Sequence, residues 1–581
     1  MLPSDIPSDP STQPPAAAPT LAASARWFQP CLALVFFAAL AIAHTWPLAA
    51  NPASWSRVDN ADYTLNAWAL AWVAHQAPRD PLHLFDANIF YPEKRTLAFS
   101  EHLVPEAAVA APVLWAGGSA VLAANVAILA GFILSGWITA LVIRRWTGDW
   151  VAGLVAGSMM AFNAHTMVRI AHVQALHTYY LPLALAALDR LLERARWRDA
   201  VAAGCWLALQ ALTSGYWLVF TASAAVAAMV ARTGEWWPWP KTVSDSPREP
   251  WRRVVLLVAA AAIASVILLP FVTPYWKARQ EQGLSRSWDE VQFFGAKGFE
   301  YLTPSGTLHM STPLAAARDP QRSIDTMFPG VLGLVLTGYA LATGLAWRDR
   351  RARMLLAIGL AGFILSLGPH VPLYRLLYTL VPLFQGIRAT TRFGFLVLVA
   401  VAGLSGCAVA DVRQRVRAKS WQNLKFIPTP ILVGVAALIV VNAEAWRAPF
   451  VYKPFTGISK VYDVVASLHR AVLIEVPAYR GISFFQNADY MLGSTVHWKP
   501  LVNGYSGFEP RSYAETAERM RPFPDDSALA RLKEVGVTHV LIHRERLGAT
   551  RDSLPARMEA SGRFHLVAAD PLLRLYELVD R

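Results

Sequence analysis

Charged side chains are scarce in this sequence. Asp, Glu, Lys and Arg make up 16% of its 581 residues, whereas hydrophobic residues make up 55%. Soluble domains are close to a quarter charged, and disordered chains are poor in apolar residues. The composition therefore excludes both an ordinary soluble enzyme and a disordered chain. It predicts an all-α polytopic membrane protein.

Cysteine is also scarce, and several catalytic motifs are missing. The three cysteines, Cys31, Cys205 and Cys407, lie in apolar stretches, so neither a disulfide framework nor a cysteine-based metal cluster is expected. No phosphate-binding glycine loop, nucleophile elbow or His-Glu-x-x-His motif is present. We therefore predict no cofactor and no metal, although the sequence leaves a divalent ion possible.

Apolar runs of about 16–22 residues recur along the chain, close to the length that a helix needs to cross a bilayer. The first follows residues 1–25, a tail rich in Pro, Ser and Ala that we expect to be disordered. The tail has no basic segment typical of a signal peptide, so the first run is interpreted as an uncleaved span. We predict about eleven spans: 29–48, 122–143, 150–165, 175–191, 200–215, 216–231, 254–272, 327–346, 354–369, 393–410 and 427–443.

The placement of Lys and Arg predicts the orientation. Five loops carry +11 of the net charge of +13, and the alternate loops carry almost no excess. Basic loops face the cytoplasm in membrane proteins. The net charge therefore indicates topology rather than nucleic-acid binding, with the N-terminus inside. The five loops are 144–149, 189–199, 232–253, 347–353 and 411–425.

The first external loop, residues 49–121, contains two further apolar elements. Leu65, Trp68 and Trp72 recur at helical spacing within 61–76, which is typical of a helix at the membrane surface. The second element, 105–121, precedes the span 122–143, which already connects the external loop to the basic loop 144–149 on the cytoplasmic side. A further crossing by 105–121 would put both loops on the same side of the membrane. We predict two juxtamembrane helices; the alternative is that the second is a twelfth span.

This topology divides the chain into parts. The tail precedes a seven-span module, 26–272, an external loop, 273–326, and four further spans within 327–443. Residues 444–581 are polar enough for an external α/β domain, with expected strands at 471–476 and 539–542 and a helix at 528–534.

Acidic residues open the first external loop. Asp59 and Asp62 share a face if that segment is helical. Desolvation near the membrane raises a carboxyl pKa, which would make Asp62 basic enough to take a proton from a hydroxyl. The alternative is structural, with Asp62 as an N-cap and Asp59 solvated.

Two other external segments carry polar residues suited to a headgroup. Glu101 and His102 lie where the first loop re-enters the membrane, and His172 and Gln174 lie in one short turn. The turn's histidines could also suggest zinc, but no acidic residue or cysteine joins them. We therefore predict a hydrogen-bonding rim around a headgroup; solvated loop residues are the alternative.

Arg388 and Arg392 are predicted to lie on the outer side, where basic residues are scarce. A guanidinium binds a phosphate through two parallel hydrogen bonds, so a phosphate partner would explain them. Snorkelling to lipid headgroups is the alternative.

The arrangement resembles the GT-C superfamily of glycosyltransferases, which includes protein mannosyltransferases and the bacterial aminoarabinose transferase of lipid A. The shared features are the acidic start of the first external loop, its two juxtamembrane helices, and a seven-span module followed by a large external loop. Local strings resemble a largely uncharacterised bacterial subgroup: 65–72, 84–93, 100–103 and 502–510.

The resemblance implies transfer of a sugar from a polyprenyl-phosphate donor to a glycan, lipid or protein acceptor, with an aspartate as general base. By position this base is Asp59 or Asp62, and we favour Asp62 because it adjoins the string 65–72. Arg388 and Arg392 would bind the donor phosphate. The expected location is the bacterial inner membrane, with 444–581 in the periplasm.

Three other functions stay open at this point. The chain could bind or assemble lipid-linked sugars without catalysis, or polymerise or ligate surface glycans. It could also be a secondary transporter, although no repeat is visible and few charges lie within the spans.

Overall fold

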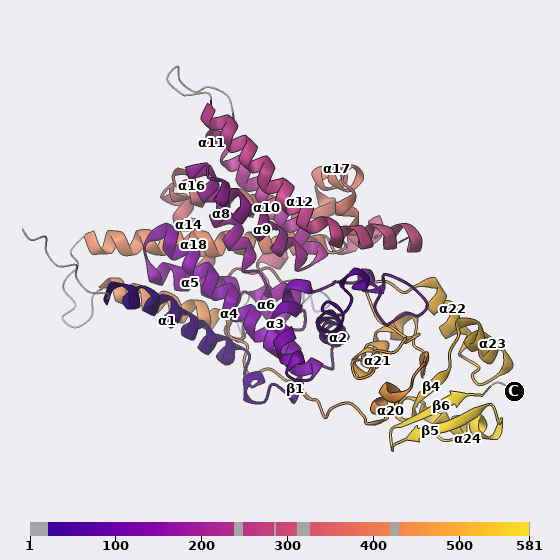
Figure 1. Ribbon diagram of the computed structural model, residues 1–581. Helices are drawn as coiled ribbons and strands as arrows, with labels where there is room; N and C mark the ends of the chain where they lie inside the picture. Colours follow the sequence, from indigo (N-terminus) through magenta and orange to yellow (C-terminus); the bar gives the residue numbers. More distant parts are fainter. Residues whose placement is uncertain (1–20, 238–247, 284–285, 311–325, 419–428, 580–581) are drawn as a thin grey trace, which may run out of the picture.

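The computed structural model describes residues 21–237, 248–283, 286–310, 326–418 and 429–579. Each predicted span coincides with a helix, and these helices form one bundle with a small sheet region beside it (Figure 1), which confirms the predicted fold class. The bundle helices are α1 (Leu21–His44), α4 (Ala120–Thr147), α5 (Trp150–Ala161), α8 (Tyr180–Arg194), α9 (Trp197–Leu212), α10 (Gly215–Ala231), α12 (Arg248–Gln282), α14 (Val331–Ala342), α16 (Arg350–Ser366), α18 (Gly394–Ala418) and α19 (Thr429–Ala445). Short helices lie between them: α6 (Ala164–Val168), α7 (Val173–Leu176), α11 (Thr233–Trp236), α13 (Trp288–Phe293), α15 (Leu345–Arg348) and α17 (Pro372–Leu380).

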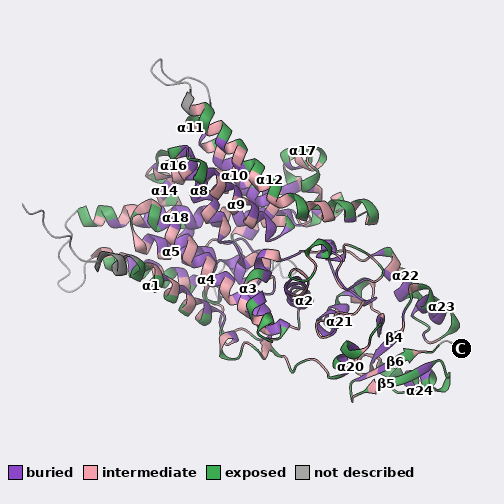
Figure 2. Ribbon diagram, viewed as in Figure 1, coloured by how far each residue is buried: buried purple, intermediate pink, exposed green. Residues whose placement is uncertain are grey.

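Five helical stretches of the described chain are long and apolar enough to cross a membrane by themselves: Trp27–His44, Ala120–Thr147, Trp150–Val168, Pro250–Gln282 and Thr390–Ala418. The outward faces of α1 and α12 are largely exposed (Figure 2), with apolar side chains such as Val35 and Val266 on them. Exposed apolar side chains on long helices suit contact with lipid tails. The number of spans stays a prediction.

Two predicted boundaries are wrong. Helix α1 begins at Leu21, so the end of the predicted tail is helical, while residues 1–20 lie outside the described chain. Helix α12 continues to Gln282, past the predicted span end at 272, because its last turns are rich in good helix formers. Parts of the predicted loops 232–253, 273–326 and 411–425 also lie outside the described residues.

The five basic loops meet at one end of the bundle. Asp189 binds both Arg232 (2.9 Å) and Arg351 (2.8 Å), and Asp149 binds Arg413 (2.8 Å). Arg351 also donates to a backbone carbonyl in the 144–149 loop (3.2 Å). The loops therefore lie on the same side of the protein, as the charge pattern predicted; which side is cytoplasmic stays a prediction.

Both helices expected in the first external loop are present. Helix α2 spans Ala61–Gln76, and α3 spans Val104–Trp115. A helix as short as α3 measures about 18 Å, less than the ~30 Å of a hydrocarbon core. Its length favours the interpretation that the segment 105–121 does not cross the membrane.

The C-terminal region, residues 446–579, contains the predicted strands and helix. The four-stranded sheet has the order β3-β4-β6-β5, with β3 (Leu473–Val476) parallel to β4 (His539–His543), and β6 (Leu573–Leu578) antiparallel to β4 and β5 (Phe564–Ala569). The helices are α20 (Val461–Ser467), α21 (Ala488–Ser494), α22 (Arg511–Arg519), α23 (Asp526–Val535) and α24 (Ser553–Ala560). Gly536 ends α23 with φ +83°, as its position in the sequence indicated.

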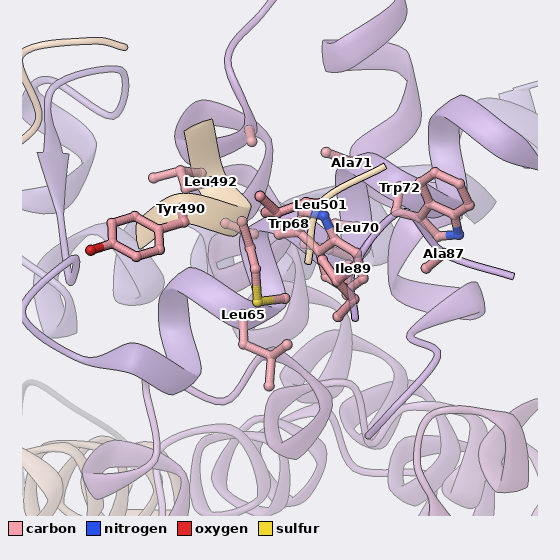
Figure 3. Close-up of a cluster of buried hydrophobic side chains, with 14 of the residues drawn as sticks. Leu65, Trp68, Leu70, Ala71, Trp72, Ala87, Ile89, Tyr490, Leu492 and Leu501 are labelled. Carbon is pink, nitrogen blue, oxygen red and sulfur yellow. The ribbon is translucent and has the colours of Figure 1, made fainter. Parts of the chain in front are cut away.

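This region packs against the first external loop. Strand β1 (Trp55–Ser56) pairs with β2 (Lys453–Pro454), and the backbone of Asn88–Tyr91 bonds to Leu501 and Asn503. Apolar side chains of α2, including Trp68, pack with α21 and Leu501 in one buried cluster (Figure 3). The two parts share a hydrophobic core, although about 400 residues separate them in the sequence.

Candidate active site

Asp62 lies in the first turn of α2, and its carboxylate does not cap the helix. The N-cap is Asn60, whose Oδ1 accepts from the backbone amides of Asp62 (3.0 Å) and Tyr63 (3.3 Å). The carboxylate instead contacts His172 through Oδ2 (3.1 Å to Nε2) and accepts a hydrogen bond from the Tyr505 hydroxyl at Oδ1 (3.0 Å). The alternative that Asp62 caps the helix is therefore wrong.

The environment of Asp62 makes its carboxylate a weaker base than we expected. Burial pushes its pKa upward, but the hydrogen bonds from His172 and Tyr505, with the charge of Arg169, lower the pKa to about 2. The expectation of a raised pKa is wrong because it counted desolvation and omitted these partners. The side chain keeps 43% exposure, so an incoming group can reach it.

Asp59 does not join this centre. It accepts from Arg57 Nε at 3.2 Å, and its side chain is 38% exposed. Helix α2 begins at Ala61, and Asn60 is extended, so the helical spacing that would place both aspartates on one face does not apply. Of the two predicted acids, only Asp62 contacts other predicted site residues.

The turn between α5 and α8 brings His172 and Gln174 to Asp62. Asn66 of α2 donates to Gln174 Oε1 and to the Ala171 carbonyl, both at 3.2 Å, which fixes the turn against the helix. Arg169 lies next to His172, with 3.4 Å between Nη1 and Nε2. His172 therefore contacts Asp62 directly, whereas Gln174 contacts Asn66, one turn further along α2; the role of both residues stays a prediction.

Glu101 and His102 enter from the end of the first external loop. Glu101 Oε2 accepts from the Gly215 amide (2.8 Å) at the start of α10. Burial raises the pKa of Glu101 to about 7, although the Gly215 amide and the charge of Arg392 oppose the rise. Its carboxyl group therefore titrates near neutral pH.

His102 is a packed, uncharged residue. Its Nδ1 accepts from the Val104 amide (3.2 Å) at the start of α3, and its ring lies against Phe85, Phe271 and Tyr275. Burial lowers the pKa of His102 to about 4. It can shape the wall of a site, but it brings no positive charge at neutral pH.

A groove of about 330 Å³ opens between α10, α12 and the segment before α18. Its walls are apolar, with Leu218, Leu268 and Phe271 among them, while Arg388 and Arg392 lie at its polar end. The two guanidinium groups lie over aromatic rings, Arg388 over Phe294 (5.0 Å) and Arg392 over Tyr216 (4.7 Å). An apolar channel with cations at one end fits a lipid that carries a phosphate.

A second, smaller cavity of about 50 Å³ adjoins the groove and reaches His172, which contacts Asp62. It is lined by Arg169, His172 and Gln174, and it shares Glu101 and Arg392 with the groove. Most predicted site residues therefore lie along one continuous path. The path begins at the groove, passes Glu101 and ends at His172, which contacts the Asp62 carboxylate.

Sequence reasoning missed three residues here. Arg279 and Arg286 also line the groove, and Tyr505 reaches Asp62 from the C-terminal region. The arginines lie in or beside the predicted loop 273–326, which contained no motif to mark them. Tyr505 belongs to the string 502–510, which was recognisable, but its contact with α2 was not.

Among the described residues, no group of three or more His, Cys, Asp or Glu side chains is arranged to hold a metal ion. Whether a divalent ion takes part stays a prediction.

Comparison with known proteins gives structural matches only. No protein-family model and no curated protein matches the sequence. Arabinofuranosyltransferase AftD from Mycobacteria matches with a TM-score of 0.56 and 14% identity, over 96% of this chain and 40% of AftD. ArnT from Cupriavidus metallidurans matches with a TM-score of 0.45 and 14% identity, over 96% of this chain and 99% of ArnT. The oligosaccharyltransferase AglB from Archaeoglobus fulgidus, solved with an inhibitory peptide and a dolichol-phosphate, matches with a TM-score of 0.46 and 14% identity, over 90% of this chain and 70% of AglB.

The likeness to AftD, at this low identity, concerns the fold. This chain spans about two fifths of the length of AftD, so the activity and substrates of that protein do not transfer with the fold.

Proposed function

We propose that this chain, which has the fold of the GT-C superfamily, is a glycosyltransferase that takes a sugar from a polyprenyl-phosphate-linked donor and passes it to an acceptor hydroxyl at the outer face of the bacterial inner membrane. The observation that supports this most is the pair of adjoining cavities that lead from the apolar groove to His172, the partner of Asp62.

The donor would bind with its prenyl chain between α10 and α12. Its phosphate would lie near Arg388 and Arg392, which stabilise the charge that grows on the leaving group as the bond to the sugar breaks. Arginine suits this role because each guanidinium offers two parallel donors to one phosphate.

The acceptor hydroxyl would replace the Tyr505 hydroxyl on Asp62 Oδ1. A carboxylate with a pKa of about 2 is a poor base toward a free alcohol. In an oxocarbenium-like transition state, however, the attacking hydroxyl becomes far more acidic as its oxygen bonds to the sugar carbon. Asp62 then takes that proton late, while His172 holds the other carboxylate oxygen in place.

The decisive test compares Asp62→Asn with the matched control Asp59→Asn. Membranes from cells that lack the native protein are supplied with each variant, and transfer of sugar from the polyprenyl carrier is followed by mass spectrometry. Asp62→Asn should lower the rate by at least ~10², the usual range for a general base. Asp59→Asn should stay within about threefold of the wild type, because Asp59 contacts only Arg57 in the described chain.

The same assay can overturn the proposal. Equal rates for wild type, both single variants and the double variant would show that neither aspartate of this loop is the general base. Loss in Asp59→Asn alone would move the role to Asp59. A protein that binds polyprenyl phosphate but never consumes a lipid-linked sugar would instead fit a binding or assembly function.

A further inference from the structure

We propose that the sugar of the donor is linked to its polyprenyl lipid through a diphosphate rather than a monophosphate. This inference rests on the function proposed above. The observation is the number and spread of cations at the polar end of the groove. Among the described residues, four arginines line it: Arg279, Arg286, Arg388 and Arg392.

These arginines come from separate elements and form two pairs. Arg388 and Arg392 lie on the segment that leads into α18, beside Glu101 and the start of α10. Arg279 lies in the last turn of α12, and Arg286 follows soon after it in the chain. The arginines of both segments line the same groove, so together they can bind two phosphates.

The groove contains too little negative charge to neutralise these cations. Among the described residues, two carboxylates lie near the four arginines: Glu290 is 3.8 Å from Arg286, and Glu101 lines the groove beside Arg392. Arg279 donates to the Gln385 side chain, and Arg286 donates to the Gly507 carbonyl (3.1 Å). Neutral acceptors like these can be exchanged for phosphate oxygens without leaving a buried carboxylate unpaired.

Charge complementarity then separates the two donor classes. A sugar linked through one phosphate carries one negative charge, whereas a sugar linked through a diphosphate carries two. After transfer the leaving group gains a further charge in either case. Against the four guanidinium groups, Glu101 and Glu290 supply at most two negative charges, so the site keeps a net charge of at least +2. The two charges of a diphosphate donor balance this net charge, whereas the single charge of a monophosphate donor does not.

The test is a binding titration with the full-length protein in detergent. A polyprenyl monophosphate and a polyprenyl diphosphate of equal chain length are titrated at the same pH and salt concentration. The diphosphate should bind at least about tenfold more tightly, and its affinity should fall more steeply with added salt.

Arg279→Gln and Arg286→Gln should each weaken diphosphate binding by about tenfold or more while leaving monophosphate binding within about threefold. Arg480→Gln, which alters an exposed arginine of the C-terminal region, is the matched control. Affinities for the two lipids that agree within about threefold would overturn the diphosphate assignment and leave the glycosyltransferase proposal intact. Binding of neither lipid would overturn both.

Discussion

Replacing Glu101 with Gln should change stability in a way that depends on pH. The fold raises the Glu101 pKa from an ordinary 4.5 to about 7, so the native protein binds this proton more tightly than the unfolded chain does. Stability is therefore lost as pH rises from about 4.5 to about 7, and the loss is complete above that range. A pKa shift corresponds to 1.36 kcal/mol per unit, so the loss of unfolding free energy amounts to ~3 kcal/mol. The partial exposure of the side chain reduces this loss to ~2 kcal/mol.

Glutamine has no proton to lose, so Glu101→Gln should escape this penalty. Relative to wild type, the variant should gain about 2 kcal/mol of unfolding free energy between pH 5 and pH 8, measured by thermal unfolding in one detergent. Glu518→Gln, at an exposed carboxylate of the C-terminal region, should show no such divergence. A difference in unfolding free energy between wild type and Glu101→Gln that does not increase with pH would refute the reasoning.

The same ionisation should oppose donor binding. Glu101 lines the groove beside Arg392, so its negative charge lies close to the phosphate site. Two like charges ~8 Å apart repel by ~2 kcal/mol at an effective dielectric of ~20, before screening by salt. A polyprenyl phosphodiester, whose charge is constant across this range, should bind wild type about 5- to 30-fold more weakly at pH 8 than at pH 6. An equal pH dependence in Glu101→Gln would assign the effect to another group.

Three further predictions follow from other parts of the molecule. Arg388→Lys should weaken polyprenyl phosphate binding despite the retained charge, since Lys cannot form two parallel bonds to one phosphate; unchanged affinity would indicate snorkelling. Arg232→Ala should cost about 1.5–3 kcal/mol of unfolding free energy, because the buried Asp189 loses its 2.9 Å bond to Arg232 but keeps Arg351 as a partner; a loss below about 0.5 kcal/mol in denaturant titrations would contradict this. In a cysteine-free background, Ser527→Cys should react with an impermeant thiol reagent from outside the cell and Arg198→Cys should not, and the reverse pattern would invert the orientation.

The helices of the bundle could be predicted because each one is encoded by contiguous residues. An apolar run of helical length predicts a helix wherever it lies, and α2 was found at its predicted bounds from the spacing of Leu65, Trp68 and Trp72. The basic loops were equally readable, since membrane topology responds to local charge.

The centre around Asp62 could be predicted only in part, because its geometry depends on distant contacts. Position alone singled out Asp62, but its low pKa comes from His172 and Tyr505, which lie about 110 and 440 residues further along the chain. No local pattern reveals such partners. Asn60, and not Asp62, is the N-cap of α2, which could be recognised only once the start of α2 was known.

The contact between Tyr505 and Asp62 also has a consequence for how the protein is made. The ribosome delivers every bundle helix before it reaches residue 505, so a nascent chain holds Arg388, His172 and Asp62 well before the site has its last member. The backbone bonds between Asn88–Tyr91 and Leu501–Asn503 likewise form only after the C-terminal region has been synthesised. The arrangement around Asp62 is thus completed last, and a chain cut short after α19 lacks Tyr505 and cannot complete this centre.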